Sequence, residues 1–510
     1  MAAWHEGYVS DIPYSLGFYR ETTLNHLAFC LSSSSVDCAE ILNAKRVLEL
    51  GFGMGVNPIV NAAVNPDVQF EGIDFNPEHV LHAKKLAEDA KITNVHLREA
   101  SFQDLAEEAN RGQHDVDIII AHGILTWVSE DARSAIVDIA SKRLRPGGVL
   151  YVSYNAMPGW APMMPLQRLM RENSSQSIAR SDQHVSSGFE LAKALVGEGA
   201  KYFAANPGVA PRLEEASKLD AHYLAHEYLN ENWTIFYFAD IAKSLNAAKL
   251  KFLASASIAE NMDSLCFPAA MLPRVAKADP IWKETLRDYA ANTQFRRDIF
   301  GRGRVTATLS DQMAMAAQVN FHLAVPRSKA TLELSTPLGK ANGNADLYLP
   351  ILDSLDSGPK TLLDLMQLPV SATKGQSAIA QAAALLVHSG QVLPSFRREI
   401  NVEPARRFNE LVVKRLQAGK LVGTLAAPVV GGGLLIEQGH AIALSAVLEG
   451  YEQDIDKAGH HAIGVLKGLG RDVTIDGKKA EPQEAQAKMR TVMEDLFTLY
   501  LPVWRRLGVL

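Results

Sequence analysis

Arg46-Val47-Leu48-Glu49-Leu50-Gly51-Phe52-Gly53-Met54-Gly55 is the stretch that decides the fold of this 510-residue chain. The apolar run from Val47 to Leu50 predicts a buried parallel strand. Three glycines at alternate positions follow it, and we expect a helix from about Asn57. Glycines permit a sharp turn and bring the backbone close to a ligand that a Cβ would exclude. The helix that follows would offer its unpaired N–H groups to that ligand.

The glycine spacing is G-x-G-x-G, which differs from the G-x-G-x-x-G of dinucleotide-binding proteins. Glu49 lies two residues before the first glycine, and a second expected strand, 68–73, ends in Asp74. An acid at the end of the second strand of a doubly wound sheet hydrogen-bonds ribose hydroxyls. The combination resembles motif I of the class I S-adenosylmethionine (SAM) methyltransferases. The alternative is an ordinary strand–turn–helix with chance glycines, and the placement of Glu49 and Asp74 argues against it.

Composition narrows the class of protein. With 51 basic and 57 acidic residues the net charge is −6, which argues against a general binder of nucleic acid or of anionic membranes. No apolar run approaches the length of a membrane span, and the first residues do not form a signal peptide. Cys30, Cys38 and Cys266 are scattered and odd in number, so we expect free thiols and a cytoplasmic location. A chain of this length should contain two or more domains.

Strands and helices alternate through the first third of the chain. Strands are expected at 46–50, 68–73, 95–98, 116–121 and 149–154, with helices between them. This rhythm predicts an α/β fold, a doubly wound (Rossmann-like) sheet with helices on both faces. Ligands of such sheets bind beyond the carboxyl ends of the strands, so the residues that follow each strand are the candidate site.

The rest of the chain divides into further predicted units. We expect the core to comprise 1–164 and 231–325, with the N-terminal residues as a lid and 165–230 as a helical insertion. We expect residues 340–400 to form a winged-helix-like module and residues 401–510 to form an α+β C-terminal domain. Because the module's third helix has only Lys360 and Lys374 at its edges, packing or protein interaction is favoured over DNA binding. His222 and His226 lie one helical turn apart without a third ligand, so we expect no metal site.

Several stretches together resemble one bacterial family. They are Asp11–Tyr14, Val47–Asn57, Ile120–Val128, Tyr151–Trp160 and His226–Leu229. The chain is similar there to class I methyltransferases that carry a methyltransferase regulatory domain, whose best-known members methylate lysines of outer-membrane proteins. The resemblance implies a seven-stranded core, the cofactor SAM and the product S-adenosylhomocysteine. It suggests a polypeptide acceptor, including outer-membrane proteins, and a homodimer is a further expectation. Phe52 departs from the small or Cys residue usual after the first glycine.

The resemblance also implies a role for the residues at the strand ends. Glu49 and the glycine turn would hold the methionine part of SAM, Asp74 the ribose, and Phe75 and Phe102 the adenine. Ser101 occupies the position where the family often has an adenine-binding Asp. The N-terminal tyrosines would either close a lid over the cofactor or pack on the core with the first helix. The residues expected at the cofactor are Tyr8, Tyr14, Glu49, Gly51, Gly53, Gly55, Asn57, Asp74, Phe75, Ser101, Phe102 and Ala121.

The acceptor site is expected after the fourth and fifth strands. Trp127, Tyr154 and Trp160 are candidates for an aromatic acceptor channel, and Asn155 for orienting the amine. His122 would either take a proton or hold its loop. The Asn-Pro-Pro-Tyr/Phe sequence of base-amino methyltransferases is absent after the fourth strand. This absence argues against DNA or RNA bases as the substrate.

Three functions remain open from the sequence. The first is a protein-lysine methyltransferase whose C-terminal domains grip the substrate polypeptide. The second is a small-molecule N- or O-methyltransferase in which those domains dimerise or cap the site. The third is a regulator that binds SAM without catalysis and signals through the winged-helix-like module.

Overall fold

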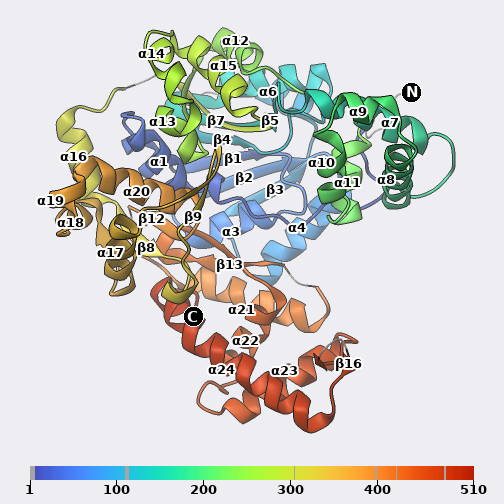
Figure 1. The fold of residues 1–510 in the computed structure, drawn as a ribbon, viewed down its shortest axis with the longest axis vertical. Coiled ribbons are helices and arrows are strands. Elements are labelled where there is room, and N and C mark those ends of the chain that lie inside the picture. The colour runs from blue at the N-terminus through green and yellow to red at the C-terminus, as the bar shows by residue number, and fades with distance from the viewer. Residues whose placement is uncertain (1–5, 110–113, 304, 397–398, 421, 476–477) are drawn as a thin grey trace.

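A seven-stranded sheet forms the centre of the protein (Figure 1). The computed structural model describes residues 6–510 apart from 110–113, 304, 397–398, 421 and 476–477. The strand order is β3-β2-β1-β4-β5-β7-β6, with β7 antiparallel to both its neighbours and the other pairs parallel. The strands are β1 (Arg46–Leu50), β2 (Gln69–Asp74), β3 (Val95–Glu99), β4 (Val116–Ala121), β5 (Leu144–Asn155), β6 (Leu250–Ser255) and β7 (Phe295–Arg302). This topology confirms the predicted doubly wound core.

The two faces of the sheet are buried in two separate hydrophobic clusters. Successive strand residues point to opposite faces, so Val47 enters one cluster and Leu48 the other. The first face is covered by α1 (Leu24–Ser33), α3 (Val56–Val64) and α4 (Pro77–Asp89). The second is covered by α5 (Phe102–Ala109), α6 (Glu130–Arg143) and α12 (Phe238–Ala247), and α15 (Pro280–Ala291) lies beside α12 (Figure 1). Burial on both faces explains the continuous apolar runs of the central strands.

The helical insertion forms a third cluster beside the sheet. It consists of η2 (Ala161–Met163), α7 (Met164–Ser174), α8 (Ser181–Gly197), α9 (Lys201–Ala205), α10 (Val209–Ala216) and α11 (Ala221–Tyr228). Val9 and Ile12 are buried in the same cluster, and the backbone N–H of Val9 donates to Oδ1 of Asn230 at 2.8 Å. The chain segment before α1 is therefore fastened to the insertion. This segment ends in η1 (Arg20–Thr22), and α1 and α2 (Ala39–Leu42) follow it. The Thr23 side chain caps α1 by accepting from His26 N–H.

Short helices connect the last two core strands. They are η3 (Ile258–Asn261), α13 (Asp263–Cys266), η4 (Ala269–Met271) and α14 (Leu272–Val275), which precede α15. All three cysteines of the chain are free and buried.

A separate small sheet, β11-β8-β12, lies after the core. Its unit contains α16 (Leu309–Gln318), β8 (Asn320–Leu323), η5 (Arg327–Lys329), the hairpin β9 (Glu333–Thr336) and β10 (Gly339–Asn342), α17 (Ala345–Asp356), β11 (Lys360–Thr361), α18 (Leu362–Met366), α19 (Ser371–Lys374), α20 (Gln376–His388) and β12 (Val392–Ser395). Because β8 pairs with β11 and β12, the expected boundaries at 325 and 340 are wrong: the unit begins before residue 320. The winged-helix-like assignment stays a prediction.

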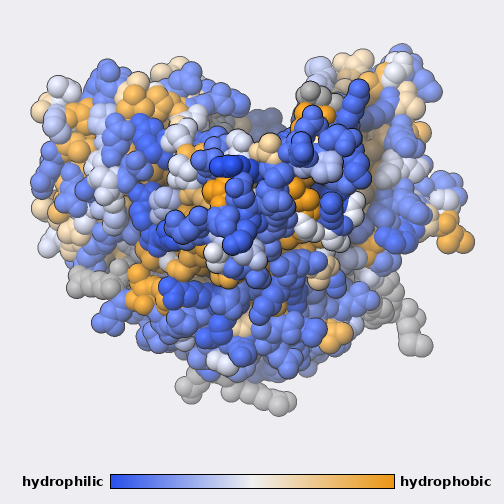
Figure 2. Space-filling view, turned by 90° about the horizontal axis from the view of Figure 1, so that it is seen from below, coloured by the Kyte–Doolittle hydropathy of each residue, from blue (hydrophilic) through white to orange (hydrophobic). Residues whose placement is uncertain are grey.

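The C-terminal part packs on the α3 side of the core (Figure 1). It comprises α21 (Glu403–Gln417), β13 (Thr424–Ala427), η6 (Pro428–Val430), β14 (Gly432–Leu435), α22 (Gln438–Leu448), α23 (Ile455–Gly468), β15 (Thr474–Ile475), β16 (Lys478–Lys479) and α24 (Pro482–Arg506). Asn25 Nδ2 donates to the carbonyl of Val430 at 2.8 Å, and Arg415 faces Asp89 at 3.4 Å. The face of the molecule seen from below is largely hydrophilic, with hydrophobic residues in small separate patches (Figure 2). Among the described residues, no helix is long and apolar enough to cross a bilayer.

Candidate functional site

A cavity opens at the carboxyl ends of β1, β2 and β4, where a doubly wound sheet binds its ligands. Its empty volume is about 750 Å³, including space open to solvent. Most of the residues expected from the sequence meet there. The cavity is lined by Tyr8, Tyr14, Ser15, Gly17, Tyr19, Glu49, Gly51, Phe52, Gly53, Met54, Gly55, Val56, Asp74, Phe75, His79, Phe102, His122, Gly123, Ile124, Trp127 and Val128.

The glycine turn forms a cradle that side chains would fill. Gly51, Gly53 and Gly55 have φ values of +68°, +56° and +80°, in the left-handed region that favours glycine. A Cβ on Gly51 would lie 2.4 Å from the Cδ1 of Ile124, and one on Gly55 would lie 2.3 Å from the Cβ of Ala83. The turn therefore needs glycine both for its conformation and for its space, and it leaves exposed backbone beside the cavity.

Asp74 is held in place by backbone N–H groups. Its Oδ2 accepts from Gly53 N–H at 2.8 Å, and its Oδ1 accepts from Asn76 N–H at 2.9 Å. His79 Nδ1 lies 3.2 Å from the same Oδ1, and the Nε2 of His79 is buried without a hydrogen-bond partner among the described residues. Oδ2 has one partner and keeps a lone pair for a further donor, whereas Oδ1 already faces two groups. The carboxylate thus suits a ligand hydroxyl such as one of the ribose of SAM.

Glu49 is a buried carboxylate on the floor of the cavity. Asn57 Nδ2 donates to both of its oxygens at 3.1 Å. Burial raises the pKa of Glu49 to about 8, because desolvation disfavours the charged form and the Asn57 hydrogen bond offsets this only in part. A cation placed beside Glu49 would stabilise its ionised form, and the ammonium group of the methionine part of SAM is such a cation.

The aromatic residues before α1 close one side of the cavity. Tyr8 meets Phe75 edge-on at 5.6 Å between ring centroids, and Tyr14 lies 6.4 Å from Trp127. Both tyrosines also contact the ring of His226, at 5.3 and 4.9 Å. Helix α1 is meanwhile buried against the core. The two interpretations of the N-terminal segment therefore coexist: its helix packs on the core and its tyrosines line the cavity.

Tyr19 lines the cavity although sequence reasoning assigned it no role. Its ring stacks on His122 with centroids 3.6 Å apart, and its backbone N–H donates to Oδ1 of Asn57 at 3.0 Å. Asn57 thus connects the N-terminal segment to Glu49. The abundance of aromatic residues before α1 was the available signal, but it could not single out one of them.

His122 is built into the wall of the cavity. Its Nδ1 is 2.9 Å from the Tyr151 hydroxyl and 3.3 Å from the Ser153 Oγ. Burial lowers the pKa of His122 to about 3, so the ring is neutral near pH 7 and a weak proton acceptor. This geometry supports the loop-holding role over proton transfer.

Ser101, Phe102 and Trp127 line a neighbouring hollow of about 520 Å³, together with Tyr8 and Phe75. The Ser101 Oγ is 2.7 Å from Asp104 and caps the first turn of α5. The aromatic rings suit a flat base, and the hollow joins the cofactor cavity through residues that line both. Of the remaining cofactor candidates, Ala121 is fully buried in the second-face cluster at the end of β4.

Tyr154 and Trp160 are not brought to the cavity, which corrects their expected place in an acceptor channel. The Tyr154 hydroxyl donates to Asp298 at 2.6 Å, and Asp298 in turn pairs with the buried Arg296. Trp160 packs against Trp233 inside the insertion cluster. Both side chains are parts of the hydrophobic core.

Asn155 and Glu227 form a polar pair beside the tyrosines. Asn155 is buried at the end of β5, and its backbone N–H donates to Oγ1 of Thr126 at 2.9 Å. Glu227, on α11, has 8% of its surface exposed. Burial raises its pKa to about 7, and hydrogen bonding from Tyr223 and Asn155 offsets this only in part. Sequence reasoning missed Glu227, because no local sequence pattern predicts that an acidic residue on a helix of the insertion is buried.

The two histidines with metal-ligand spacing point to different surroundings. His226 is buried against Tyr8 and Tyr14, whereas His222 Nε2 faces Asp182 at 3.7 Å. Within the described part of the chain, no group of three or more His, Cys, Asp or Glu side chains could hold a metal ion.

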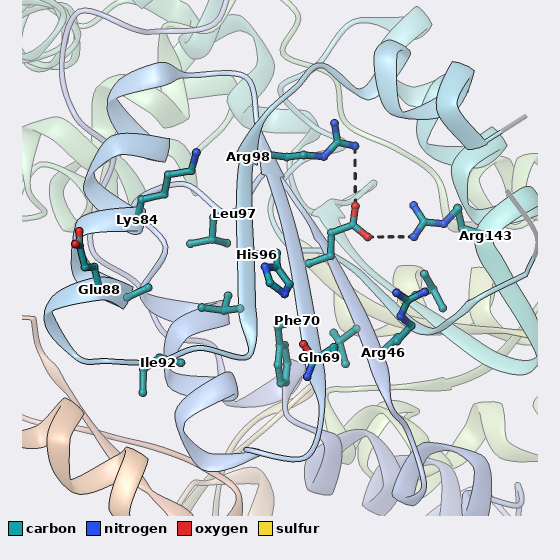
Figure 3. Close-up of a pocket in the computed structure, with 15 residues that line it drawn as sticks. Arg46, Gln69, Phe70, Lys84, Glu88, Ile92, His96, Leu97, Arg98 and Arg143 are labelled. Carbon is teal, nitrogen blue, oxygen red and sulfur yellow. Dashed lines mark hydrogen bonds and ion pairs between the residues drawn. The ribbon is translucent and has the colours of Figure 1, made fainter. Parts of the chain in front are cut away.

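A larger hollow of about 1210 Å³ lies around the first residues of β1, β2 and β4, at the opposite end of the sheet (Figure 3). Its arginines are paired: Glu71 lies 3.0 Å from Arg143 and 4.0 Å from Arg98, and Arg46 pairs with Asp115 at 2.7 Å. These pairs neutralise one another, so the hollow offers no excess of charge for a ligand.

Comparisons with known proteins agree with this geometry. Residues 41–207 match a family model described as "Methyltransferase domain", and residues 220–302 match "Predicted methyltransferase regulatory domain". The chain is 32% identical over 516 residues to the uncharacterized protein sll1526 of Synechocystis sp., covering 99% of each. It is 29% identical over 215 residues to the uncharacterized protein RP028 of Rickettsia prowazekii, covering 42% of this chain and 83% of the relative. PKMT2 from Rickettsia typhi, also solved in complex with AdoHcy, shares its fold: TM-score 0.69, 20% identity, 95% of this chain and 98% of that one covered.

Proposed function

The chain belongs to the class I SAM-dependent methyltransferases that carry a methyltransferase regulatory domain, and from this premise we propose that it methylates lysine amines of a polypeptide. Its cofactor is SAM. The observation that carries the choice of acceptor is the aromatic wall of Tyr14, Tyr19 and Trp127 around the cavity. Aromatic faces attract an alkylammonium group by about 0.5–2 kcal/mol and suit a narrow aliphatic chain. The name PKMT2, an abbreviation of protein lysine methyltransferase, supports the same acceptor.

The residues present fit the cofactor. In the proposed arrangement, Glu49 faces the ammonium group of the methionine part, and the backbone of the glycine turn lies along it. Asp74 receives the ribose hydroxyls. Phe75 and Phe102 lie on either side of the adenine, in the hollow that adjoins the main cavity. Bound SAM supplies a methyl group on a positively charged sulfur.

The protein's part in such a transfer is mainly alignment. Holding the nucleophile in line with the methyl carbon and the sulfur contributes up to roughly 7–11 kcal/mol. A lysine amine must be neutral to attack, although its ordinary pKa is about 10.4. Burial beside a positive charge lowers that pKa, and the closed aromatic wall excludes water from the amine.

Labelled SAM tests the acceptor. The protein is incubated with methyl-tritiated SAM and a cell lysate that includes an outer-membrane fraction, and labelled polypeptides are hydrolysed for amino-acid analysis. We expect label in methylated lysine. Label in small metabolites would instead support the N- or O-methyltransferase alternative, and no label in either fraction would support the regulator. The Asp74→Asn variant is the matched control, since it should bind SAM poorly and label nothing.

The location and the assembly of the protein are further parts of the proposal. A cytoplasmic enzyme would meet an outer-membrane protein before its export, and a homodimer would present two sites to one chain. Size-exclusion chromatography with light scattering measures the second of these directly.

A further inference from the structure

Glu227 is a buried carboxylate that lacks an ion-pair partner among the described residues. The charged group that acts on it is Arg212 of α10, whose guanidinium lies 4.0 Å above the ring of Trp160 and donates to the carbonyl of Gly159 at 3.2 Å. A buried carboxylate without a cation is costly to ionise. The site is therefore electrostatically incomplete in a way that a bound cation would correct.

The groups around Glu227 come from four parts of the chain. Asn155 acts on the Glu227 carboxylate. Its buried Nδ2 has no partner at ordinary hydrogen-bond distance, so the contact between the two side chains is longer than an ordinary hydrogen bond. Tyrosine hydroxyls supply most of the other polar atoms, and the pKa of each is raised mainly by burial, with a smaller contribution from the Glu227 carboxylate. The titratable and charged groups facing Glu227 are Tyr8, Tyr14 and Tyr19 from the segment before α1, Arg212 from α10, and Tyr223 and Tyr228 from α11.

The same tyrosines connect Glu227 to the cofactor cavity. Tyr14 acts on the Tyr19 hydroxyl and lowers its pKa against the larger effect of burial, and both tyrosines line the cavity. Tyr14 lies over the glycine turn, with its Cδ1 3.5 Å from where a Cβ of Gly53 would be. Glu227 itself is not among the residues that line the cavity, but it lies near Tyr8, Tyr14 and Tyr19, which do.

We propose that Glu227 is the catalytic base for the acceptor: it binds the lysine ammonium group beside the cavity and takes a proton from it before the methyl group is transferred. This inference rests on the proposed function. Its geometric basis is a buried carboxylate that has no ion-pair partner in the described part of the chain and that lies near tyrosines of the cavity lining.

The lysine ammonium gives one proton to the Glu227 carboxylate, which leaves a neutral amine and a carboxylic acid. The amine nitrogen then forms a bond to the methyl carbon while the carbon–sulfur bond breaks and its electron pair stays on sulfur. The products are a methylated ammonium and S-adenosylhomocysteine, and Glu227 returns its proton to water when the site opens.

Glu227 suits this role better than His122 does. Burial raises the pKa of Glu227 to about 7, whereas it lowers that of His122 to about 3. A general base works best when its pKa lies near the working pH, and such a base contributes about 10²–10⁴-fold to the rate.

Four variants test the inference with the polypeptide that takes up label. Glu227→Gln removes the charge at nearly constant volume, and Glu227→Asp keeps it. Tyr223→Phe removes a hydrogen bond that lowers the pKa of Glu227. Glu260→Gln is the matched control, because burial also raises the pKa of Glu260 to about 7. The Glu260 carboxylate accepts from Ser255 Oγ at 2.6 Å, and neither residue lines the cavity.

The expected results separate a base from a structural residue. Glu227→Gln should slow transfer by about 10²–10⁴-fold with the SAM affinity from calorimetry unchanged, while Glu227→Asp keeps part of the rate. The pH–rate midpoint near 7 should rise in Tyr223→Phe and stay unchanged in Glu260→Gln. Infrared difference spectra supply a readout without turnover. The carboxylic acid absorption that titrates near pH 7 should lose one component in Glu227→Gln and a different component in Glu260→Gln, because burial raises the pKa of both side chains to about 7.

The outcomes distinguish this inference from the proposed function. If label enters methyl-lysine and Glu227→Gln transfers it at the wild-type rate, the role of Glu227 is overturned and the lysine acceptor stands. If Glu227→Gln lowers SAM affinity as much as transfer, Glu227 serves the cofactor and the inference is equally overturned. Label confined to small molecules overturns the lysine acceptor and the Glu227 role together.

Discussion

Binding of SAM should release a proton from Glu49. This side chain is buried on the floor of the cavity, and its pKa is raised to about 8 by desolvation. For a carboxylate with a raised folded-state pKa, the contribution to stability is complete below the unfolded pKa and is lost as the pH rises through the folded value. The ammonium group of SAM, placed beside Glu49, favours the ionised form. Binding and ionisation of Glu49 are therefore coupled.

The raised pKa of Glu49 sets how strongly the affinity for SAM changes with pH. With a pKa near 8, roughly one Glu49 in a hundred is ionised at about pH 6 and about a quarter at about pH 7.5. If SAM binds the ionised form, its affinity should rise about 20-fold between these two conditions, since affinity follows the ionised fraction. The amino group of SAM, with a pKa of about 7.7–8.0, is itself about a quarter to two-fifths neutral at about pH 7.5, which reduces the expected rise to about 15–18-fold.

Isothermal titration calorimetry measures both quantities. The affinity for SAM is determined across this pH range, and the binding enthalpy at about pH 6.5 is compared in buffers of different ionisation enthalpy. We expect the release of nearly one proton by the wild type and none by Glu49→Gln, whose affinity should be independent of pH. Glu260→Gln should behave like the wild type. A wild-type affinity that is flat with pH, or equal proton release in Glu49→Gln, would refute the reasoning.

Three further predictions concern the affinity for SAM and the stability of the fold. Asp74→Asn should weaken SAM binding about 10–100-fold in calorimetry, because charge-assisted hydrogen bonds contribute about 1.5–3 kcal/mol; an unchanged affinity would contradict its assignment to the ribose. Gly55→Ala should lower the free energy of unfolding by about 1–3 kcal/mol more than Gly199→Ala, since both glycines have positive φ and only Gly55 would strike Ala83. Arg296→Met should cost about 3–5 kcal/mol in urea denaturation, because it leaves buried carboxylates unpaired; a loss below about 1 kcal/mol would contradict this.

The first third of the fold could be predicted because its signals are local. The apolar run of β1 reflects a strand buried on both faces, and the three glycines reflect a turn with positive φ. Asp74 follows β2 at the edge where parallel strands end together, so its place beside the turn follows from the topology. These features depend on neighbouring residues along the chain and on one general rule of α/β sheets.

The acceptor side could not be predicted in the same way. Tyr151 and Ser153 point to the face of β5 that carries His122, and Tyr154 points to the opposite face, where it meets Asp298. A shift of one residue along a strand reverses the side-chain direction, so listing the aromatic residues near a strand end did not decide which of them face the ligand.

The sequence by itself determined the sheet, the glycine cradle and the acid that adjoins it, because each is encoded within a few residues or by strand periodicity. Only the tertiary structure decided that Glu227 lies near Tyr19, a residue of the cavity lining more than two hundred positions earlier in the chain. It also placed β8 in the second sheet and Trp160 in the insertion core. Contacts of this kind arise from the packing of distant helices, and burial of a polar group depends on neighbours that no local pattern specifies.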